Sequence, residues 1–516
     1  ERYQYQSSRA SVLAYDSGEA NGKQVQLIEA SMLLPEEMGV DMNRRLVMQI
    51  GTDETHSYTL DLQRLKGGAV HENVLRGSED ENSELITDLA LPEPVAEKLR
   101  PYMIERFGAN SCAGTNFYTN YVKNYRIVDT DKDITFQWRG MTEDDTFHAF
   151  IKGVPGAMVA FSEIPSLRRA KEDGSDAWDY PAPHFYQHRE VTPEEVTKFA
   201  GVYEGTKSGE TAFVQSVRWI DFADSPTAAA AVIDLGNKKD IVYVSEDDVV
   251  RNVEGIGFRG SIALLRMDKQ TNQPEFCYLY SEGEIRYGDK VFTGNPDFSA
   301  NVVSTTEQVG GGKGENTITV DRDLPAGALE GLASRMYFSN GAGIAHEIIG
   351  QAADGRTLYI HNPAGVKIVE DGAQMTFVPN SYNVTKQSLN YWGADVYIPY
   401  VIPGEVQLVI STPKIGQMEP AAAGDITLQT AEGAPAAVIE KGKTYRIAFQ
   451  SPDLDNRLYI AAVTTGGERM ESAAALQQGG NALEVSIPAE GESTLQVFVW
   501  DKKTLQPYDI RQYATG

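Results

Sequence analysis

The stretch Ile134-Thr135-Phe136-Gln137-Trp138 is the part of the sequence that decides the fold. Its three apolar residues alternate with polar ones, so they share one face of an extended chain. The same period of two recurs in residues 445–449 and 495–500. Turn signals recur about every ten residues, and long amphipathic helical patterns are nearly absent. The sequence therefore predicts an all-β chain of stacked antiparallel sandwiches.

The length of 516 residues predicts three or four domains at roughly 100–200 residues each. A turn cluster at residues 294–296 and a linker-like stretch at 413–424 suggest the boundaries. We expect a large antiparallel β-sandwich over residues 1–294 and a smaller β domain over 295–415. Residues 420–516 have the size of one immunoglobulin-like sandwich.

Three local patterns depart from simple strands. Residues 94–107 carry apolar side chains at helical spacing, and we expect Pro101 to break that helix. Thr192 and Glu195 match a capping box and predict a short helical turn. Residues 129–133 alternate aspartates but lack the glycine and glutamate of a calcium loop. We expect a polar hairpin tip there.

The formal net charge is −27, which excludes nucleic acid as a partner, since a polyanion would be repelled. An acidic polysaccharide would be repelled as well, unless basic residues cluster locally. The tight basic pairs are Arg44-Arg45 and Arg168-Arg169. No run of about 18 apolar residues occurs, so the sequence predicts no membrane-spanning segment.

The two cysteines, Cys112 and Cys277, are too few for a disulfide framework or a zinc ribbon, and whether they are bridged stays open. Glu1 is not a start methionine and no charged-then-apolar leader follows it. We therefore expect a mature or truncated product. The acidic, β-rich composition suggests a secreted or cell-surface protein, the periplasm included.

The motifs of common catalytic sites are missing from the sequence. His184 and His188 lie four residues apart, as two metal ligands on a helix would. The prolines before them and the aromatic residues between them favour an extended chain instead. On a strand the two rings would share a face about 13 Å apart. We therefore expect no metal ion, no cofactor and no catalytic residue that spacing alone could identify.

One region resembles a known enzyme family. Asn43-Arg44-Arg45-Leu46-Val47-Met48-Gln49-Ile50 leads into Ser57-Tyr58-Thr59-Leu60-Asp61-Leu62-Gln63-Arg64-Leu65-Lys66-Gly67-Gly68, and His71 follows. This is similar to the β-sandwich of heparinase II/III-type polysaccharide lyases. Residues 146–150, 198–204 and 316–331 look like later strands of that family, so the resemblance covers roughly residues 5–365. We expect Asp61 and Arg64 to pair at the end of a strand, and Gly67-Gly68 permits a tight turn at positive φ.

The resemblance implies an enzyme that cleaves uronic-acid-containing polysaccharide by β-elimination. In that family the His and Tyr catalysts lie largely on an N-terminal α/α toroid, which this sequence lacks. The chain would thus be a C-terminal β portion, inactive alone, with an acidic polysaccharide and a toroid from the same precursor as partners. Arg9 would stand where the family has a metal-binding histidine. Candidates for lining a saccharide groove are Arg64, His71, His148, Trp178 and Trp392.

The alternative is a non-catalytic extracellular protein, either a glycan-binding module or a component of a surface layer or filament. Stacked β domains and high acidity suit this alternative too. Trp138 alternates with core residues, so we expect it to be buried. Trp178 and Trp392 are the better candidates for exposed sugar-stacking platforms.

Overall fold

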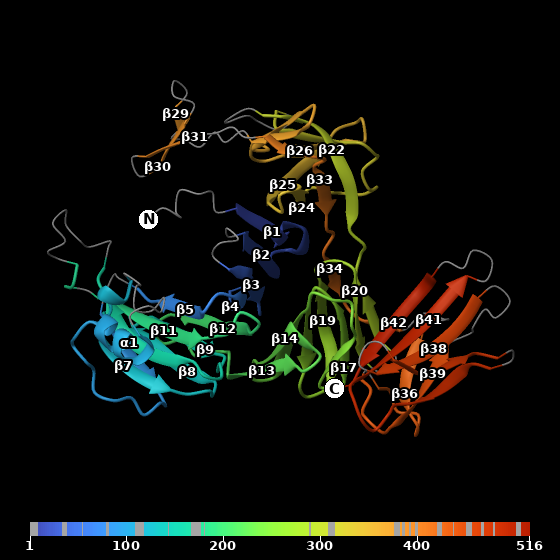
Figure 1. Ribbon diagram of the computed structural model, residues 1–516, viewed down its shortest axis with the longest axis horizontal. Helices are drawn as coiled ribbons and strands as arrows, with labels where there is room; N and C mark the ends of the chain where they lie inside the picture. The colour runs from blue at the N-terminus through green and yellow to red at the C-terminus, as the bar shows by residue number, and fades with distance from the viewer. Residues whose placement is uncertain are drawn as a thin grey trace. The chain divides into compact units, whose positions relative to one another are not determined.

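The fold was analysed in a computed structural model of the whole chain (Figure 1). The described residues are all those outside 1–8, 34–38, 54, 79–81, 109–117, 143, 167–176, 180, 288–289, 308–314, 376–381, 384–387, 392–393, 398–400, 421–425, 437, 450–456, 466–468, 478–479, 502–506 and 516.

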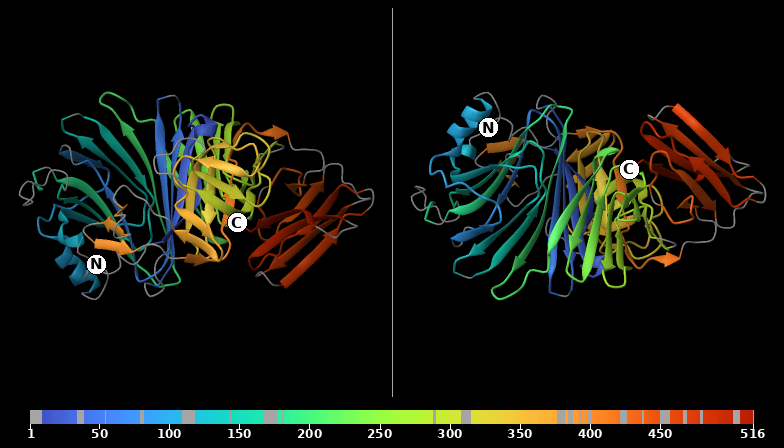
Figure 2. Two further views of the ribbon diagram at one scale, coloured as in Figure 1. Left: turned by 90° about the horizontal axis from the view of Figure 1, so that it is seen from above. Right: turned by 90° about the horizontal axis from the view of Figure 1, so that it is seen from below.

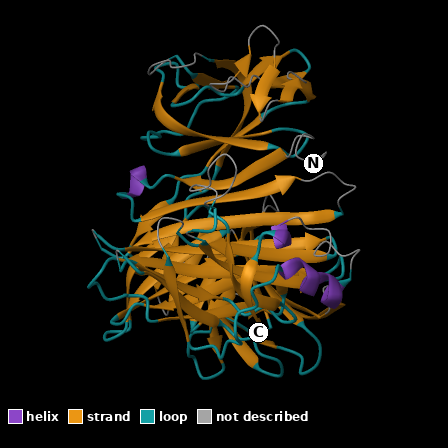
Figure 3. Ribbon diagram, turned by 90° about the vertical axis from the view of Figure 1, so that its left-hand side faces the viewer, coloured by secondary structure: helices purple, strands orange, loops and turns teal. Residues whose placement is uncertain are grey.

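The protein is an all-β chain, as the alternating pattern predicted, and the described residues contain one α-helix (Figure 3). The chain groups into two compact units. Unit 1 comprises residues 1–214 and 298–410, and unit 2 comprises residues 215–297 and 411–516. The division into consecutive domains 1–294, 295–415 and 420–516 stays a prediction about independently folding parts.

A 14-stranded sheet forms most of unit 1. Its neighbours are antiparallel except β25 and β1, which pair in parallel through Gly343 and Ser11. In spatial order the strands are β24 (Ala333–Tyr337), β33 (Gln407–Ile410), β22 (Phe298–Thr306), β23 (Thr317–Val320), β26 (Thr357–Ile360), β25 (Gly343–Gln351), β1 (Arg9–Asp16), β2 (Val25–Leu33), β3 (Val40–Gly51), β4 (Ser57–Gly67), β12 (Val196–Thr206), β9 (Thr146–Ile151), β8 (Ile134–Gly140) and β6 (Ser83–Thr87).

A four-stranded sheet packs on the end of that sheet and closes a sandwich (Figure 2). Its order is β5 (Val70–Arg76), β11 (Ala182–Glu190), β10 (Met158–Ile164) and β7 (Lys123–Asp129). Phe136 and Trp138 from β8 meet Phe161 and Phe185 in the core between the sheets. Trp138 is 4% exposed, which confirms the expected burial. The aromatic pairs here are edge-on or offset, the geometries that rings prefer.

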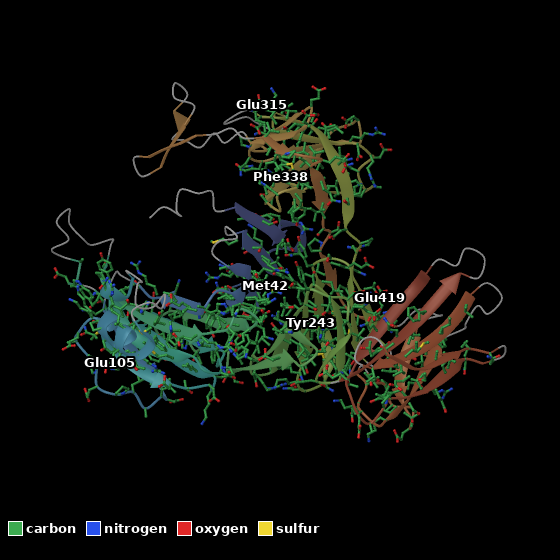
Figure 4. All side chains as sticks on the ribbon, viewed as in Figure 1. Met42, Glu105, Tyr243, Glu315, Phe338 and Glu419 are labelled. Carbon is green, nitrogen blue, oxygen red and sulfur yellow. The ribbon has the colours of Figure 1, made fainter. Side chains whose placement is uncertain are left out.

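The helix α1 (Leu99–Phe107) covers the outer face of the four-stranded sheet. Leu99 and Met103 are buried there, whereas Glu105, labelled in Figure 4, is exposed. The expectation that Pro101 breaks this helix is wrong. The helix begins at Leu99, so Pro101 lies in the first turn, where a missing N–H costs no intrahelical hydrogen bond.

Two further expectations about turns have different outcomes. Residues 129–133 do not form a hairpin tip, because β7 pairs with β10 in one sheet while β8 pairs with β9 in the other. The segment crosses between the layers instead. Gly67 and Gly68 adopt φ of 85° and 73°, which confirms the tight turn. A Cβ at Gly67 would lie 2.4 Å from the Gly39 carbonyl oxygen, so only glycine fits.

The remaining elements of unit 1 are short. They are the three-stranded sheets of β27 (Val366–Val369), β28 (Gly372–Met375) and β32 (Val401–Pro403) and of β29 (Tyr382–Asn383), β30 (Ser388–Tyr391) and β31 (Ala394–Tyr397), and the 3₁₀ turns Glu19–Asn21 and Tyr118–Asn120. Phe338, labelled in Figure 4, belongs to the core cluster that β22 to β28 share. The Thr192–Glu195 segment is one turn, held by a 2.7 Å bond from the Thr192 N–H to the Glu195 carboxylate.

The described residues of unit 2 form four sheets. A six-stranded sheet has the order β13 (Ser216–Phe222), β14 (Ser225–Asp234), β15 (Lys238–Val244), β18 (Ile262–Asp268), β19 (Gln273–Leu279) and β34 (Lys414–Gly416). A five-stranded sheet has the order β16 (Arg251–Val253), β17 (Ile256–Gly260), β20 (Gly283–Tyr287), β21 (Lys290–Thr293) and β35 (Glu419–Pro420). The rings of Tyr243 and Phe258 stack between these two sheets, with their centroids 5.5 Å apart.

The C-terminal part of unit 2 is the expected antiparallel sandwich. One sheet is β36 (Ile426–Thr430), β37 (Thr444–Phe449) and β40 (Ala482–Ser486). The other is β39 (Arg469–Ala475), β38 (Arg457–Thr465), β41 (Ser493–Asp501) and β42 (Pro507–Ala514). Tyr445, Ile447 and Phe449 face one shared core with Leu495 and Val497, as their period of two predicted.

Candidate functional site

The candidate site lies at one end of the unit 1 sandwich, where six strands begin or end. Antiparallel pairing brings the starts of β4, β6 and β9 beside the ends of β8 and β12. The end of β5 joins them from the other sheet, where the Gly77 N–H donates to the Pro183 carbonyl. A cavity of about 1250 Å³ opens at this end, and we call it the end cleft. Binding sites commonly form where strand ends present loops on a rigid scaffold.

A row of three aromatic rings lines the end cleft. Phe147 stacks on Trp138 with ring centroids 5.7 Å apart, and on Tyr203 with centroids 5.5 Å apart. Pairing between β8, β9 and β12 explains the row, because it places alternate residues of all three strands on one face. Burial and the neighbouring Asp61 carboxylate raise the pKa of the Tyr203 hydroxyl, so it stays a neutral hydrogen-bonding group at neutral pH.

An Asp–His pair lies at the rim of the end cleft. The Nδ1 atom of His56 is 2.9 Å and 2.8 Å from the two carboxylate oxygens of Asp53. The Thr55 and His56 N–H groups donate to Asp53 Oδ1, and these hydrogen bonds lower the pKa of Asp53. The Asp53 carboxylate and Thr55 Oγ1, which is 3.0 Å from the same Nδ1 atom, thus fix the orientation of the His56 ring. The ring is further fixed by an edge contact with Phe213, 5.7 Å between centroids.

Glu204 fixes the loop on the other side of the end cleft. Its side chain is 2% exposed and accepts hydrogen bonds from the Phe213 N–H at 2.9 Å and the Val214 N–H at 3.0 Å. Burial raises the pKa of Glu204, although these two donors oppose that shift. The 207–214 loop is therefore tied to β12 by a buried carboxylate.

A second cavity, of about 520 Å³, adjoins the end cleft, and we call it the side cavity. Trp138 and Ser83 line both cavities, so one indole separates them. The apolar wall of the side cavity comes from Trp138, Phe161 and Pro183, and its polar groups come from β7, β10 and β6. The combination of a ring wall and a few convergent polar groups is typical of small-molecule sites.

Asn124 and Glu163 supply the polar side of that second cavity. Asn124 Nδ2 donates to Glu163 Oε2 at 2.5 Å. Asn124 adopts φ of 50°, in the left-handed region, and lies where the register of β7 and β10 shifts between Phe161 and Glu163. Such a bulge turns a side chain away from the regular alternation. Backbone strain of this kind occurs often at functional sites.

Of the residues proposed from the sequence, the four that the structure describes line neither cavity. Arg64 is fully buried and pairs with Glu29, not with Asp61, because positions 61 and 64 point to opposite faces of β4. His71 is satisfied internally, with Nδ1 2.7 Å from Thr197 Oγ1 and Nε2 2.8 Å from the Gly67 oxygen. His148 lies half-buried, its Nε2 3.0 Å from Thr206 Oγ1.

The two tryptophan candidates remain predictions as sugar platforms. Trp178 is half-buried, and the Lys123 ammonium lies 4.4 Å from its ring centroid, over one face. Trp392 lies outside the described residues. His184 and His188 are on β11, extended as expected, with the Tyr186 ring between theirs. His184 bonds to Ser162 at 2.7 Å and His188 to Glu72 at 3.1 Å, so each has its own partner.

Both arginines of the first basic pair are engaged by carboxylates. Arg44 pairs with Glu29 at 2.9 Å, and Arg45 pairs with Asp61 through two bonds of 2.9 Å and 2.6 Å. Arg168 and Arg169 lie outside the described residues. Within the described part of the chain, no group of three or more His, Cys, Asp or Glu side chains is placed to hold a metal ion. No described helix is long and apolar enough to cross a membrane.

Sequence reasoning missed the residues that line the two cavities. Arg126, Phe147 and Glu204 come from separate strands and His56 comes from the loop before β4, and no short spacing connects the four. One local signal was available, since Asp53 precedes His56 by three residues and an aspartate in a turn readily accepts nearby N–H groups.

Comparisons with solved structures give distant matches. No protein-family model matches the chain, and no curated protein matches it. A β-1,2-glucanase from Parabacteroides distasonis is 12% identical, with a TM-score of 0.12. That match covers 54% of this chain and 36% of the glucanase chain. The extracellular domain of a putative hybrid two component system from B. thetaiotaomicron is 9% identical, with a TM-score of 0.14, and the match covers 99% of this chain and 97% of that one. Similarities this low carry no argument about function.

Proposed function

We propose that unit 1 binds a polysaccharide in the end cleft. The observation that carries the proposal is the stacked row of Trp138, Phe147 and Tyr203 in a cavity of about 1250 Å³. Both faces of the Phe147 ring are covered by its neighbours, so the row presents an apolar edge against which a sugar ring can pack, while hydroxyl and carboxylate groups around it bond the sugar hydroxyls. A cavity of this size has room for more than one sugar unit.

The enzyme class is a further part of the proposal. The resemblance of residues 43–68 to heparinase II/III-type lyases supports a β portion of such an enzyme, acting on uronic-acid-containing polysaccharide together with a helical toroid. A non-catalytic extracellular glycan-binding or surface-layer protein is the alternative. Binding in the end cleft is common to both, so it is tested first.

The test is calorimetric titration of the full chain with a panel of acidic and neutral oligosaccharides, comparing wild type with Phe147→Leu. Leucine keeps apolar volume but removes the ring, so we expect weaker binding with the fold retained. Phe276→Leu, a half-buried phenylalanine in unit 2, is the matched control and should bind as wild type. Equal affinity in all three proteins, or no binding to any oligosaccharide, would refute the proposal.

The lyase assignment has its own assay. The chain alone is expected to produce no unsaturated uronate from heparan, chondroitin or alginate, because the family's catalysts lie largely on the toroid. A rise in ultraviolet absorbance above a buffer control would contradict this expectation and leave the binding result unaffected.

A further inference from the structure

The charges that line the side cavity bear on which kind of sugar it can hold. The lining contains the carboxylates of Glu84 and Glu163 and the guanidinium of Arg126. Glu84 pairs with Arg139, a cation outside the lining. His184, also in the lining, has its pKa lowered to about 3 by burial and by Arg76, so it is neutral at neutral pH. The lining itself therefore holds two carboxylates and one guanidinium, whereas the Arg76 guanidinium lines the end cleft.

The geometry of the polar groups suits hydroxyls. Glu163 can accept hydrogen bonds, and its position is fixed by the Asn124 amide at 2.5 Å. Arg126 lies two residues further along β7, half-buried, and no ion pair of its guanidinium occurs among the described residues. A fixed acceptor beside a planar donor matches the paired donor and acceptor roles of adjacent sugar hydroxyls.

A carboxylate-bearing sugar fits less well. A uronate bound to Arg126 would approach the Glu163 carboxylate, and like charges at close range disfavour binding. The chain's net charge of −27 adds long-range repulsion of any acidic polymer. Moving Glu163 away would break its bond to Asn124 and leave that strained residue without its partner.

We propose that the side cavity is a subsite for one uncharged sugar ring, packed against the apolar wall that Trp138, Phe161 and Pro183 share and bonded through its hydroxyls to Arg126 and Glu163. This inference rests on the proposed binding of a polysaccharide in the end cleft. The volume of about 520 Å³ lies within the range of about 300–1,000 Å³ typical of small-ligand sites. An acidic polysaccharide would then have to place a neutral unit at this position.

A matched pair of ligands tests the charge preference. One is an oligosaccharide of alginate, in which every unit carries a carboxylate, and the other is the same oligosaccharide after chemical reduction of its uronates to neutral hexoses. We expect the full-length protein to bind the reduced form about tenfold more tightly in calorimetry at about 0.15 M salt. Equal or tighter binding of the uronate form would overturn the subsite inference but not the proposed function. Absence of binding by both forms would overturn both.

Point variants separate the local charges from the long-range field. Glu163→Gln should reduce the ratio of the two ligands' affinities several-fold, because it removes the local carboxylate that repels a uronate. The net charge of −27 changes by only one unit, so the long-range field stays nearly the same. Arg126→Met should lower the affinity for the reduced ligand at least about tenfold. Arg322→Met, at an exposed arginine of unit 1 that lines neither cavity, is the matched control and should leave both affinities unchanged.

Asn124→Gly provides a variant that does not lose stability. Glycine accepts the φ of 50° without strain, so the fold should be at least as stable as wild type by thermal unfolding. Without the amide, Glu163 loses its fixed position, and binding of the reduced ligand should fall several-fold. Unchanged binding in both Asn124→Gly and Arg126→Met would place the sugar elsewhere and overturn the inference.

Discussion

Arg64 donates a hydrogen bond to Glu29 from the neighbouring part of the 14-stranded sheet, and both side chains are buried. The Nε–H group of Arg44 donates to the same Glu29 carboxylate at 3.0 Å. Two guanidinium groups thus share one buried carboxylate. This arrangement gives Arg64 a structural role in place of the substrate-binding role that the sequence suggested.

Removal of Arg64 should be strongly destabilising. Arg64→Met leaves a buried Glu29 with one cation fewer, and we expect a loss of about 3 kcal/mol in the free energy of unfolding, measured by urea denaturation. Arg45, the residue after Arg44, forms an exposed ion pair with Asp61. Arg45→Met removes that pair and should lower the free energy of unfolding by about 0–1 kcal/mol. Similar losses in the two variants would contradict the assignment of a buried network.

Buried histidines should make unit 1 sensitive to acid. Burial lowers the pKa of His346 from 6.5 to about 4, while the unfolded chain keeps the ordinary value. The unfolded state therefore binds more protons below pH 6.5, so stability is full above that value and falls as the pH drops towards 4.

The His346 contribution can be isolated by substitution. Between about pH 7.5 and pH 5 the protonation of His346 in the unfolded state lowers the free energy of unfolding by roughly 2 kcal/mol. His346→Gln should therefore remove about that much of the loss of stability in acid. Glutamine can still donate to the Ala364 carbonyl, which His346 Nε2 contacts at 3.1 Å. His361→Gln, at an exposed position, is the control. An unchanged pH dependence in His346→Gln would show that this histidine is not the cause.

Cys277 should be unreactive in the native protein. It is a free thiol on β19 with no exposed surface, and burial raises its pKa to about 12. The thiolate needed for alkylation or disulfide exchange is therefore scarce at neutral pH. Cys112 lies outside the described residues, so the experiment uses Cys112→Ser. A thiol reagent should detect no cysteine before denaturation and one after it, and rapid native labelling would contradict the prediction.

Gly77 should tolerate no side chain. A Cβ there would lie 2.5 Å from Pro183 Cγ and 2.9 Å from Trp138 Cε3, at the indole that separates the two cavities. Gly77→Ala should cost about 1–3 kcal/mol by overpacking and should weaken glycan binding by displacing Trp138. A Cβ at Gly205 meets nothing within 4 Å, so Gly205→Ala is the stability control. Wild-type stability in Gly77→Ala would show that Trp138 can move without cost.

The local pattern was enough to assign the strands. Alternation in residues 134–138 placed Phe136 and Trp138 on the buried face, and Gly67-Gly68 marked a turn that needs positive φ. These features depend on neighbours along the chain, because the pleat has a period of two and φ is a property of single residues. The all-β class followed from them, whereas the C-terminal sandwich was predicted from the length of residues 420–516.

The tertiary structure alone decided which strands pair, and with that the site. Residues 129–133 look like a hairpin tip, yet they connect two different sheets. Arg64 could have met Asp61, but the pleat turns it towards Glu29, 35 residues earlier. Trp138, Phe147 and Tyr203 form one row because β12, which is distant in sequence from β8 and β9, is the neighbour of β9 in the sheet. Strand partners are chosen by the summed burial of whole faces, a long-range quantity that no single stretch of sequence encodes.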